Sequence, residues 1–232
     1  MNATKIEYLN FTWSPLVGCS GDNCAVYKHC FAKKFKKRNL LKCPKCFAFE
    51  PHRHFERLDQ PINTKMPRLI GVCFAADFWD KGFDMADRMP VLTTASIAPQ
   101  HWFINLTKQP QNIPDMPFPT KWVQGVTVNR KSELWRIQDL QRSWALTKMI
   151  SFEPLYEDLG IIDLTGIDWI IIGNQTHPDF IASWFWIDSL VNQAKAKGIP
   201  VFIKNNVKDY ANLKEYPAKF ALNRNNLTKK EE

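Results

Sequence analysis

The sequence predicts an α/β fold, in the form of a partial, open β/α barrel of about six to seven parallel strands. Seven short apolar segments recur along the chain, and most are continuous runs, which is typical of strands buried on both faces of a parallel sheet. Plausible helices lie between several of them, and this alternation favours parallel pairing through crossovers. The 232 residues are fewer than the roughly 250 of a closed eight-unit barrel. An abbreviated, open barrel therefore fits better.

The elements are expected in a regular order. The predicted strands are Tyr8–Trp13, Arg68–Phe74, Trp102–Leu106, Trp122–Val128, Lys148–Phe152, Trp169–Ile172 and Val201–Ile203. The predicted helices are Met85–Ser96, Lys131–Leu146 and Ser183–Lys197. In the last helix Trp184, Ile187, Leu190, Val191 and Ala194 fall on one face, which predicts burial of that face. The proline-rich segment Gln109–Thr120 and the segment Tyr156–Asp168 are expected to be loops.

Composition predicts one domain over residues 1–222, with a cysteine-rich, basic insertion at about 19–58 and a polar tail at 223–232. The net charge of +8 favours polyanionic partners such as nucleic acid. No signal peptide is apparent at the N-terminus, and the longest apolar run, Leu69–Ala76, is too short to span a membrane. We therefore expect a cytoplasmic protein, in which six cysteines indicate metal binding or reactivity over disulfides.

Three cysteines, Cys19, Cys24 and Cys30, lie within twelve residues directly after the first predicted strand. Thiolates crowded on one short loop are expected to be bridged or bound to metal. Gly18 and Gly21 allow the backbone to fold tightly around an inorganic centre. Three ligands would leave one iron of a [4Fe–4S] cluster open for chemistry, whereas a structural centre is normally closed by a fourth ligand.

A second pair, Cys43 and Cys46, has the Cys-x2-Cys spacing of a zinc half-site. It could bind zinc or a second iron centre. Together with Cys24 and Cys30 it could form a four-thiolate zinc site that leaves Cys19 spare. His52 and His54 are also close enough in sequence to contribute ligands.

Each predicted strand is followed at once by polar residues, and carboxyl ends of parallel strands build the active sites of barrels. The candidates of this kind are Asp77, Lys108, Glu153, Asn174, Gln175 and Lys204. Glu153 lies between Phe152 and Pro154, where a charge is costly unless it is paired or used. An equally weighted alternative is a structural role, for example an ion pair of Glu153 with Lys204 across the barrel mouth.

A basic run follows the cysteine cluster, with aromatic residues interleaved as on a helix with one apolar face. Its cations are Lys33, Lys34, Lys36, Lys37 and Arg38. This pattern predicts a nucleic-acid-binding patch. The alternative is a solvated helix face.

Several of these motifs together resemble a phage-associated three-cysteine family related to radical S-adenosylmethionine (radical SAM) enzymes. The resemblance rests on Thr12-Trp13-Ser14-Pro15 with Gly18-Cys19, Cys24 and Cys30-Phe31-Ala32, and on Pro51–Leu58, Ala76–Phe78, Leu106–Pro110, Ser151–Leu155, Asp168–Gly173 and Pro200–Lys204. It spans most of the chain. The spacing here is Cys-x4-Cys-x5-Cys, longer than the Cys-x3-Cys-x2-Cys loop typical of radical SAM enzymes.

The resemblance implies a radical SAM-like barrel that holds a [4Fe–4S] cluster on Cys19, Cys24 and Cys30. One electron from the cluster would cleave SAM reductively, and the resulting radical would abstract hydrogen from the substrate. By position, Asp77, Glu153 and Asn174 are the candidates for binding SAM, and Gln175 for cofactor or substrate. Lys108, Glu153 and Lys204 are the catalytic candidates, the two lysines for substrate or phosphate.

The implied substrate is a nucleotide or nucleic acid that is modified or repaired, with spore photoproduct lyase as the radical SAM precedent on DNA. An electron-donor protein is required, and a partner protein could close the open barrel. Two alternatives remain. One is a non-catalytic, zinc-stabilised nucleic-acid-binding protein, and the other is a barrel that has lost its cluster and binds only a small molecule.

Overall fold

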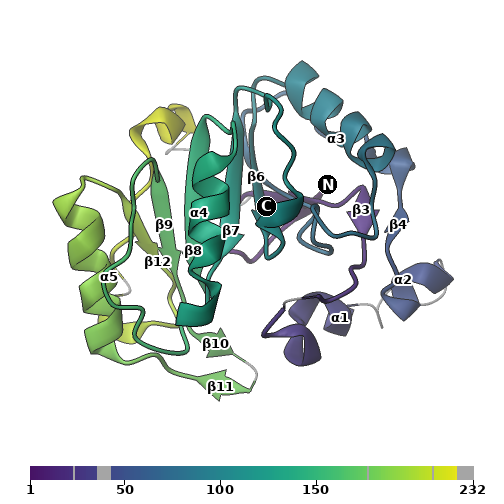
Figure 1. The fold of residues 1–232 in the computed structure, drawn as a ribbon. Coiled ribbons are helices and arrows are strands. Elements are labelled where there is room, and N and C mark those ends of the chain that lie inside the picture. The colour runs from purple at the N-terminus through teal and green to yellow at the C-terminus, as the bar shows by residue number, and fades with distance from the viewer. Residues whose placement is uncertain (23, 36–42, 177, 211, 224–232) are drawn as a thin grey trace.

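The computed structural model describes residues 1–22, 24–35, 43–176, 178–210 and 212–223, and its centre is an eight-stranded sheet (Figure 1). Every pairing in this sheet is parallel except the antiparallel pair at its N-terminal edge, β1 with β2. In sheet order the strands are β1 (Asn2–Ala3), β2 (Phe11–Trp13), β5 (Leu69–Val72), β6 (Trp102–Thr107), β7 (Trp122–Thr127), β8 (Thr147–Phe152), β9 (Trp169–Ile172) and β12 (Val201–Ile203). Because β1 and β12 form its two edges, the sheet is open within the described residues.

All seven predicted strands are present, and the α/β class is confirmed. The order of the strands in the sheet is the same as their order along the chain. All parallel strands from β2 to β12 therefore end at the same edge. The apolar runs are buried on both faces, as the continuous pattern predicts. In β9, Ile170 and Ile172 join a core cluster with residues of α4 and α5, whereas Trp169 and Ile171 join a cluster on the opposite face.

Helices α3 (Met85–Ile97), α4 (Trp135–Arg142) and α5 (Trp184–Ala196) follow β5, β7 and the β10–β11 hairpin (Figure 1). Asp84 caps α3, since its side chain accepts from the Asp87 N–H while the Asp87 carboxylate accepts from the Asp84 N–H. The hairpin strands are β10 (Gln175–Thr176) and β11 (Asp179–Phe180). The segments expected to be loops contain no α-helix, and Gln109–Thr120 has only a short 3-10 turn at Pro110–Asn112.

Two helix predictions need correction. The helix expected over Lys131–Leu146 is a 3-10 turn, Lys131–Glu133, followed by the shorter α4, because Ser143 is extended and its hydroxyl donates back to the Leu140 carbonyl. Trp184 was expected on the buried face of α5 but is 51% exposed, where it stacks on Phe185. It lies at the first position of the helix, whereas the buried residues of α5 begin one turn later at Ile187.

The face of the sheet opposite the helices is filled with aromatic side chains. Tyr8 contacts Trp169 and Phe202 edge-on, with ring centroids 5.7 and 5.8 Å apart. Phe220 and Tyr216, from the C-terminal segment, pack against Trp169 from the other side. This packing closes the interior up to the carboxyl ends of the strands, where space remains.

Among the residues that the structure describes, the predicted basic, cysteine-rich insertion and the short strand before it contain only small elements. They are β3 (Leu16–Val17), α1 (Phe31–Phe35), α2 (Pro44–Ala48) and β4 (His52–Arg53), with 3-10 turns at Tyr27–His29 and Phe55–Arg57. Strands β3 and β4 pair with each other in a separate two-stranded sheet. Further 3-10 turns lie at Lys208–Tyr210 and Ala218–Asn223. Within the described part of the chain, no helix has the length and apolar character needed to cross a membrane.

A buried ion pair joins the turn before α4 to the start of the helix, and its loss should be costly. Arg136 and Glu133 lie 3.0 Å apart with side chains only 1% and 10% exposed, and Arg136 also donates to the Thr127 carbonyl at the end of β7. Replacing Glu133 with Ala should lower the free energy of unfolding by about 3–5 kcal/mol, because it removes the carboxylate that pairs with a buried guanidinium and accepts from the buried Asn129 N–H. Urea denaturation measures this change.

The matched control is the exposed pair Asp139 and Arg142, also three residues apart, in which Arg142 is 74% exposed. Asp139→Ala should cost less than about 1 kcal/mol. Equal losses at the two sites would contradict the role assigned to burial.

Candidate functional site

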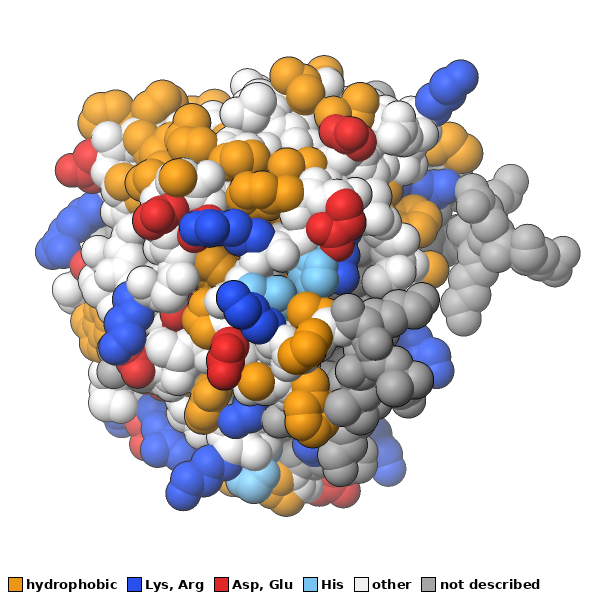
Figure 2. All heavy atoms as spheres, turned by 90° about the vertical axis from the view of Figure 1, so that its right-hand side faces the viewer, with side chains coloured by type: hydrophobic (Ala, Val, Ile, Leu, Met, Phe, Trp, Pro, Cys, Tyr) orange, Lys and Arg blue, Asp and Glu red, His pale blue; other side chains and the backbone are white. Residues whose placement is uncertain are grey.

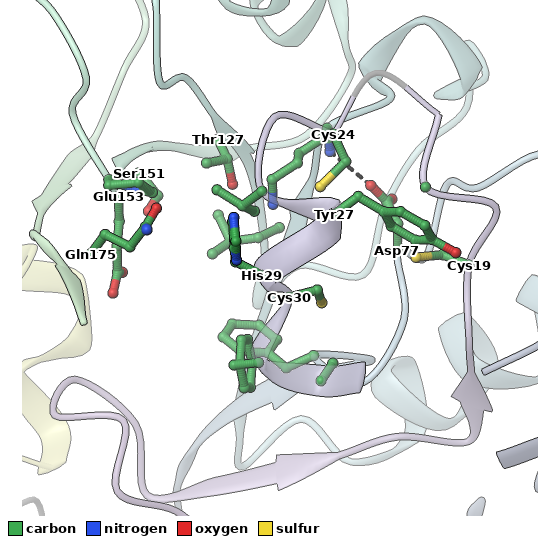
Figure 3. Close-up of a pocket in the computed structure, with 18 of the residues that line it drawn as sticks. Cys19, Cys24, Tyr27, His29, Cys30, Asp77, Thr127, Ser151, Glu153 and Gln175 are labelled. Carbon is green, nitrogen blue, oxygen red and sulfur yellow. Dashed lines mark hydrogen bonds between the residues drawn. The ribbon is translucent and has the colours of Figure 1, made fainter. Parts of the chain in front are cut away.

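A cavity of about 760 Å³ lies at the carboxyl ends of the parallel strands, against the loops of the insertion (Figure 3). Its lining contains all nine of the cluster cysteines and strand-end residues singled out from the sequence: Cys19, Cys24, Cys30, Asp77, Lys108, Glu153, Asn174, Gln175 and Lys204. The cysteines and Asp77 lie on one side, and Ser151, Glu153 and Gln175 lie on the other. Aromatic residues of the sheet interior, including Tyr8 and Phe74, also contribute to the lining.

The loop that carries Cys19 is anchored by the buried carboxylate of Asp80. One Asp80 oxygen accepts from the Ser20 N–H at 3.0 Å, the Ser20 hydroxyl at 2.7 Å and the Gln109 amide at 2.8 Å. Its other oxygen accepts from the Gly82 N–H at 2.8 Å. The residue next to Cys19 is thereby tied to the turns that follow β5 and β6. A signal for this role is present in the sequence, because Asp77 and Asp80 are two acidic residues about one turn apart after a predicted strand.

Cys24 and Cys30 flank a single turn of the same loop. The Tyr27 N–H donates to the Cys24 carbonyl at 3.1 Å, and the Cys30 N–H donates to the Tyr27 carbonyl at 3.3 Å. Cys30 directly precedes α1, whose Lys33 places its ammonium 3.8 Å from the centre of the Tyr27 ring. The three half-buried thiols therefore face one wall of the cavity.

The electrostatic surroundings oppose free thiolates at this wall. Burial and, to a smaller extent, the charges of Asp80, Asp77, Cys30 and Cys24 together raise the pKa of Cys19 to about 12. Burial also raises the pKa of Cys24, although the ammonium of Lys108 lowers it in part. A positively charged metal centre would reverse this balance, because coordination deprotonates a thiol outright.

The spacing of these thiols bears on what they could bind. In the described parts of the chain, the one group of three or more Cys, His, Asp or Glu ligand atoms within 4.8 Å of one another lies elsewhere. Cys19, Cys24 and Cys30 are thus spread more widely than a single ion requires. A cubane cluster offers each thiolate a separate iron, so its three ligands need not converge on one point. Three thiols on one cavity wall are the type of donor that such a cluster takes.

Asp77 mainly holds the strand ends together. Its carboxylate accepts from the Thr107 hydroxyl at 2.6 Å, the Lys108 N–H at 2.8 Å and the Trp79 N–H at 3.1 Å. Burial raises its pKa, while these hydrogen bonds and the Lys108 charge act in the opposite direction. This network fixes Lys108 at the cavity wall, and among the described residues no carboxylate pairs with the Lys108 ammonium.

Glu153 and Lys204 form an ion pair at the cavity wall, as the structural alternative predicted. Both side chains remain partly exposed, at 25% and 19%. Gly173, at the end of β9, makes room for them, because a Cβ there would lie 2.9 Å from Lys204 Cδ and 3.2 Å from Glu153 Cδ. The pair is accessible from the cavity, so it can also contact a bound molecule.

Asn174 and Gln175 are largely engaged by the protein. The Asn174 side chain accepts from the Ala182 N–H and donates to the Asn206 carbonyl, and its backbone N–H donates to the Asn206 side chain. Gln175 accepts from the Tyr156 hydroxyl and donates to the Pro178 carbonyl at 2.6 Å. Both residues shape the loop after β9 and also line the cavity, so their contact with SAM stays a prediction.

Thr127 and Ser151 are lining residues that sequence inspection missed. They occupy the last or next-to-last positions of β7 and β8, and both are buried. The sequence could have indicated them, because each is a hydroxyl residue at or near the carboxyl end of a largely apolar strand.

The second cysteine pair forms a separate site. Cys43 and Cys46 converge with His52 and His54, and the four ligand atoms all lie within 4.8 Å of one another, so this group could hold a metal ion such as zinc. The alternative four-thiolate site of Cys24, Cys30, Cys43 and Cys46 is not formed. The reason is that β4 pairs with β3 and brings the two histidines, not the cavity cysteines, to the Cys-x2-Cys turn.

The predicted nucleic-acid patch is described only in part. Lys33 and Lys34 lie on α1, and Lys34 is exposed and contributes to the cavity lining. Lys36, Lys37 and Arg38 lie outside the described residues.

The Asp80 network predicts a local effect on the cysteine loop. Asp80→Asn keeps the shape of the side chain but turns an NH2 group toward donors, which should cost about 1–3 kcal/mol for each donor left unsatisfied. We expect lower stability in urea and faster proteolytic cleavage near Ser20. Asp115→Asn, at an exposed position, is the matched control. Unchanged cleavage in Asp80→Asn would contradict the anchoring role.

Comparison with known proteins identifies the family of the chain. No curated protein and no solved structure matches the chain. One family model, described as a protein of unknown function (DUF5131), matches residues 3–225 and so covers nearly the whole chain. The chain belongs to the DUF5131 family.

Proposed function

We propose that this protein is an iron–sulfur enzyme of the radical SAM type that modifies or repairs a nucleotide or nucleic acid. The observation that carries the proposal is the position of Cys19, Cys24 and Cys30, which line one cavity at the carboxyl edge of a parallel sheet. This edge is where barrel enzymes assemble their active sites. The in-order strands β2 to β12 support a partial, open barrel as the finer description of the fold.

The three thiolates would hold a [4Fe–4S] cluster, and SAM would occupy the neighbouring cavity. When bound, such a cluster supplies the electron that cleaves the sulfonium of SAM reductively. A volume of about 760 Å³ lies within the range typical of pockets for small molecules and cofactors. The sheet interior is filled by aromatic side chains, so it excludes water from below.

The strand-end residues take distinct parts in this proposal. Lys108 offers an ammonium to an anionic group, and its position is fixed by the hydrogen bond from its N–H to Asp77. Glu153 and Lys204 present one anion and one cation side by side, which suits a ligand with a charged amino acid end. Thr127 and Ser151 supply hydroxyls. Asn174 and Gln175 support the loop that frames the site.

Iron content tests the proposal directly. Protein purified without oxygen should contain iron and sulfide with a broad absorption near about 400 nm, as [4Fe–4S] proteins do in general. Replacing Cys19, Cys24 and Cys30 together with Ser should abolish iron binding and the production of 5′-deoxyadenosine from SAM. Cys73→Ala is the matched control, because Cys73 is a buried core thiol outside the cavity.

Two outcomes would overturn the proposal. One is the absence of iron after anaerobic reconstitution of the unaltered chain. The other is an equal iron content in the triple variant and in Cys73→Ala.

The second candidate is a non-catalytic, zinc-stabilised nucleic-acid-binding protein. It is favoured by the Cys43, Cys46, His52 and His54 group, which lies on the same insertion as the basic helix α1. The two candidates differ at the cavity cysteines, which would carry iron only in the first. A protein that binds zinc and nucleic acid but takes up no iron after reconstitution would support the second.

Charge reversal tests the nucleic-acid patch that both candidates share. Lys33→Glu with Lys34→Glu should lower affinity for single-stranded DNA or RNA and reduce the salt slope by about 0.7 for each lost phosphate contact. Lys195→Glu with Lys197→Glu, at the exposed end of α5, makes the same change of charge and is the control. Fluorescence anisotropy at several salt concentrations gives both quantities. Weak binding that is flat with salt would exclude a polymer substrate.

A further inference from the structure

We propose that Cys43, Cys46, His52 and His54 bind one zinc ion in a closed tetrahedral site, and that this ion braces the wall of the cavity that carries Cys19. The site lies on the insertion, at the side of the molecule formed by α2, β3 and β4 (Figure 1). Figure 2 faces this side, and histidine side chains are visible there among hydrophobic and charged ones. The inference does not depend on the proposed radical chemistry, although it deepens the account of the same cavity.

The four donor atoms are spaced as ligands of one ion. Cys46 Sγ lies 3.1 Å from Nε2 of both His52 and His54, and Cys43 Sγ lies 3.4 Å from His52 Nε2. The two Nε2 atoms lie 2.9 Å apart. Tetrahedral zinc with Zn–N of about 2.0–2.1 Å and Zn–S of about 2.3 Å would separate nitrogen pairs by about 3.3 Å and sulfur–nitrogen pairs by about 3.6 Å. The observed atoms need to move apart by only a few tenths of an ångström.

The second nitrogen of each histidine fixes which atom faces the site. His52 Nδ1 lies 2.7 Å from the Glu50 carbonyl oxygen, which can only accept, so Nδ1 carries the proton. His54 Nδ1 lies 2.7 Å from Glu56 Oε1 and donates in the same way. With the proton on Nδ1, both Nε2 atoms present lone pairs toward the two sulfurs and are available to bind a metal ion. Such outer partners are typical of histidines that bind metal.

The ligand types select zinc and a structural role. Two sulfurs and two imidazoles in tetrahedral arrangement are typical of zinc. The Cys-x2-Cys turn is preorganised, because Cys43 caps α2 and its Sγ accepts from the Cys46 N–H at 3.4 Å. Four protein ligands leave no position for water or substrate, so the site is closed, unlike the three-cysteine wall of the cavity.

The site is joined to the cysteine loop through backbone contacts. In the β3–β4 pair His52 lies opposite Val17, two residues before Cys19. Gly18 packs so closely on the carbonyl of Glu50 that a Cβ at Gly18, where φ is +85°, would lie 2.1 Å from that oxygen. This is the carbonyl to which His52 donates. Phe49, in the turn between the cysteines and the histidines, is buried and lines the cavity. An ion that fixes this turn therefore also fixes the backbone beside Cys19.

Metal analysis of the full chain and its variants tests the binding. The unaltered protein should contain one zinc per chain, and Co²⁺ in its place should give the visible absorption of a tetrahedral thiolate site. Cys43→Ser with Cys46→Ser should lose zinc, whereas the Cys19, Cys24 and Cys30 triple serine variant should retain it. Loss of iron with retention of zinc, or the reverse, separates a failure of this inference from a failure of the proposed function.

Three further variants distinguish loss of zinc binding from simple misfolding. Glu56 is exposed, and its side chain supports His54, so Glu56→Ala should weaken zinc affinity by about 10-fold or more. Glu50→Ala should leave affinity unchanged, because Glu50 supports His52 through its backbone carbonyl. His54→Cys should retain zinc, since it replaces one ligand with another. Equal affinities for Glu56→Ala and Glu50→Ala, or zinc retained without Cys43 and Cys46, would overturn the site.

Hydrogen exchange tests the bracing. Removing zinc with a chelator should increase amide exchange in residues 16–20 as well as in residues 43–54, while exchange in the strands β7 and β8 stays unchanged. Exchange that rises only within residues 43–54 would show that the ion does not brace the cavity wall.

Discussion

The in-order parallel pairing of β2, β5, β6, β7, β8, β9 and β12 is the constraint on which the rest of the molecule depends. Because consecutive strands run in the same direction, their carboxyl ends meet at one edge, and every loop that follows a strand arrives there. Aromatic residues such as Tyr8 and Trp169 fill one face of the sheet, and the helices cover the other. The space that remains is the cavity at that edge, so its position follows from the pairing and not from any single residue.

Two groups of thiols lie on the same insertion but suit different inorganic centres. The cavity cysteines are half-buried, widely spaced and directed to open space, with Asp77 and Asp80 nearby to raise the pKa of Cys19. Cys43 and Cys46 instead converge with two histidines whose outer nitrogens are already hydrogen-bonded. The first arrangement places three thiols on an open cavity, while the second brings four ligand atoms together. The two groups are separate, so the proposed iron–sulfur cluster and the proposed zinc ion would not compete for the same thiols.

Most polar residues at the cavity edge have a structural partner as well as access to the cavity. Glu153 pairs with Lys204, Asp77 accepts from the Lys108 backbone, and Asn174 is engaged by neighbouring loops. Such dual roles are expected at this edge, because unpaired charges beside an apolar strand are costly and a ligand is held best by groups that are already positioned. Lys108 differs from the others in that no described carboxylate pairs with its ammonium.

The sequence by itself determined the seven strands, the extent of α3 and α5, and the residues that gather at the cavity. These features are local, because continuous apolar runs and the polar residues that follow them can be read along the chain. The early end of α4 is set locally, by the bond from the Ser143 hydroxyl to the Leu140 carbonyl. Tertiary structure alone decided the exposure of Trp184 and the choice of histidines over cavity cysteines as partners for Cys43 and Cys46. Each depends on which segments meet in space: the pairing of β3 with β4 joins residues 35 or more positions apart, and no spacing rule specifies that contact.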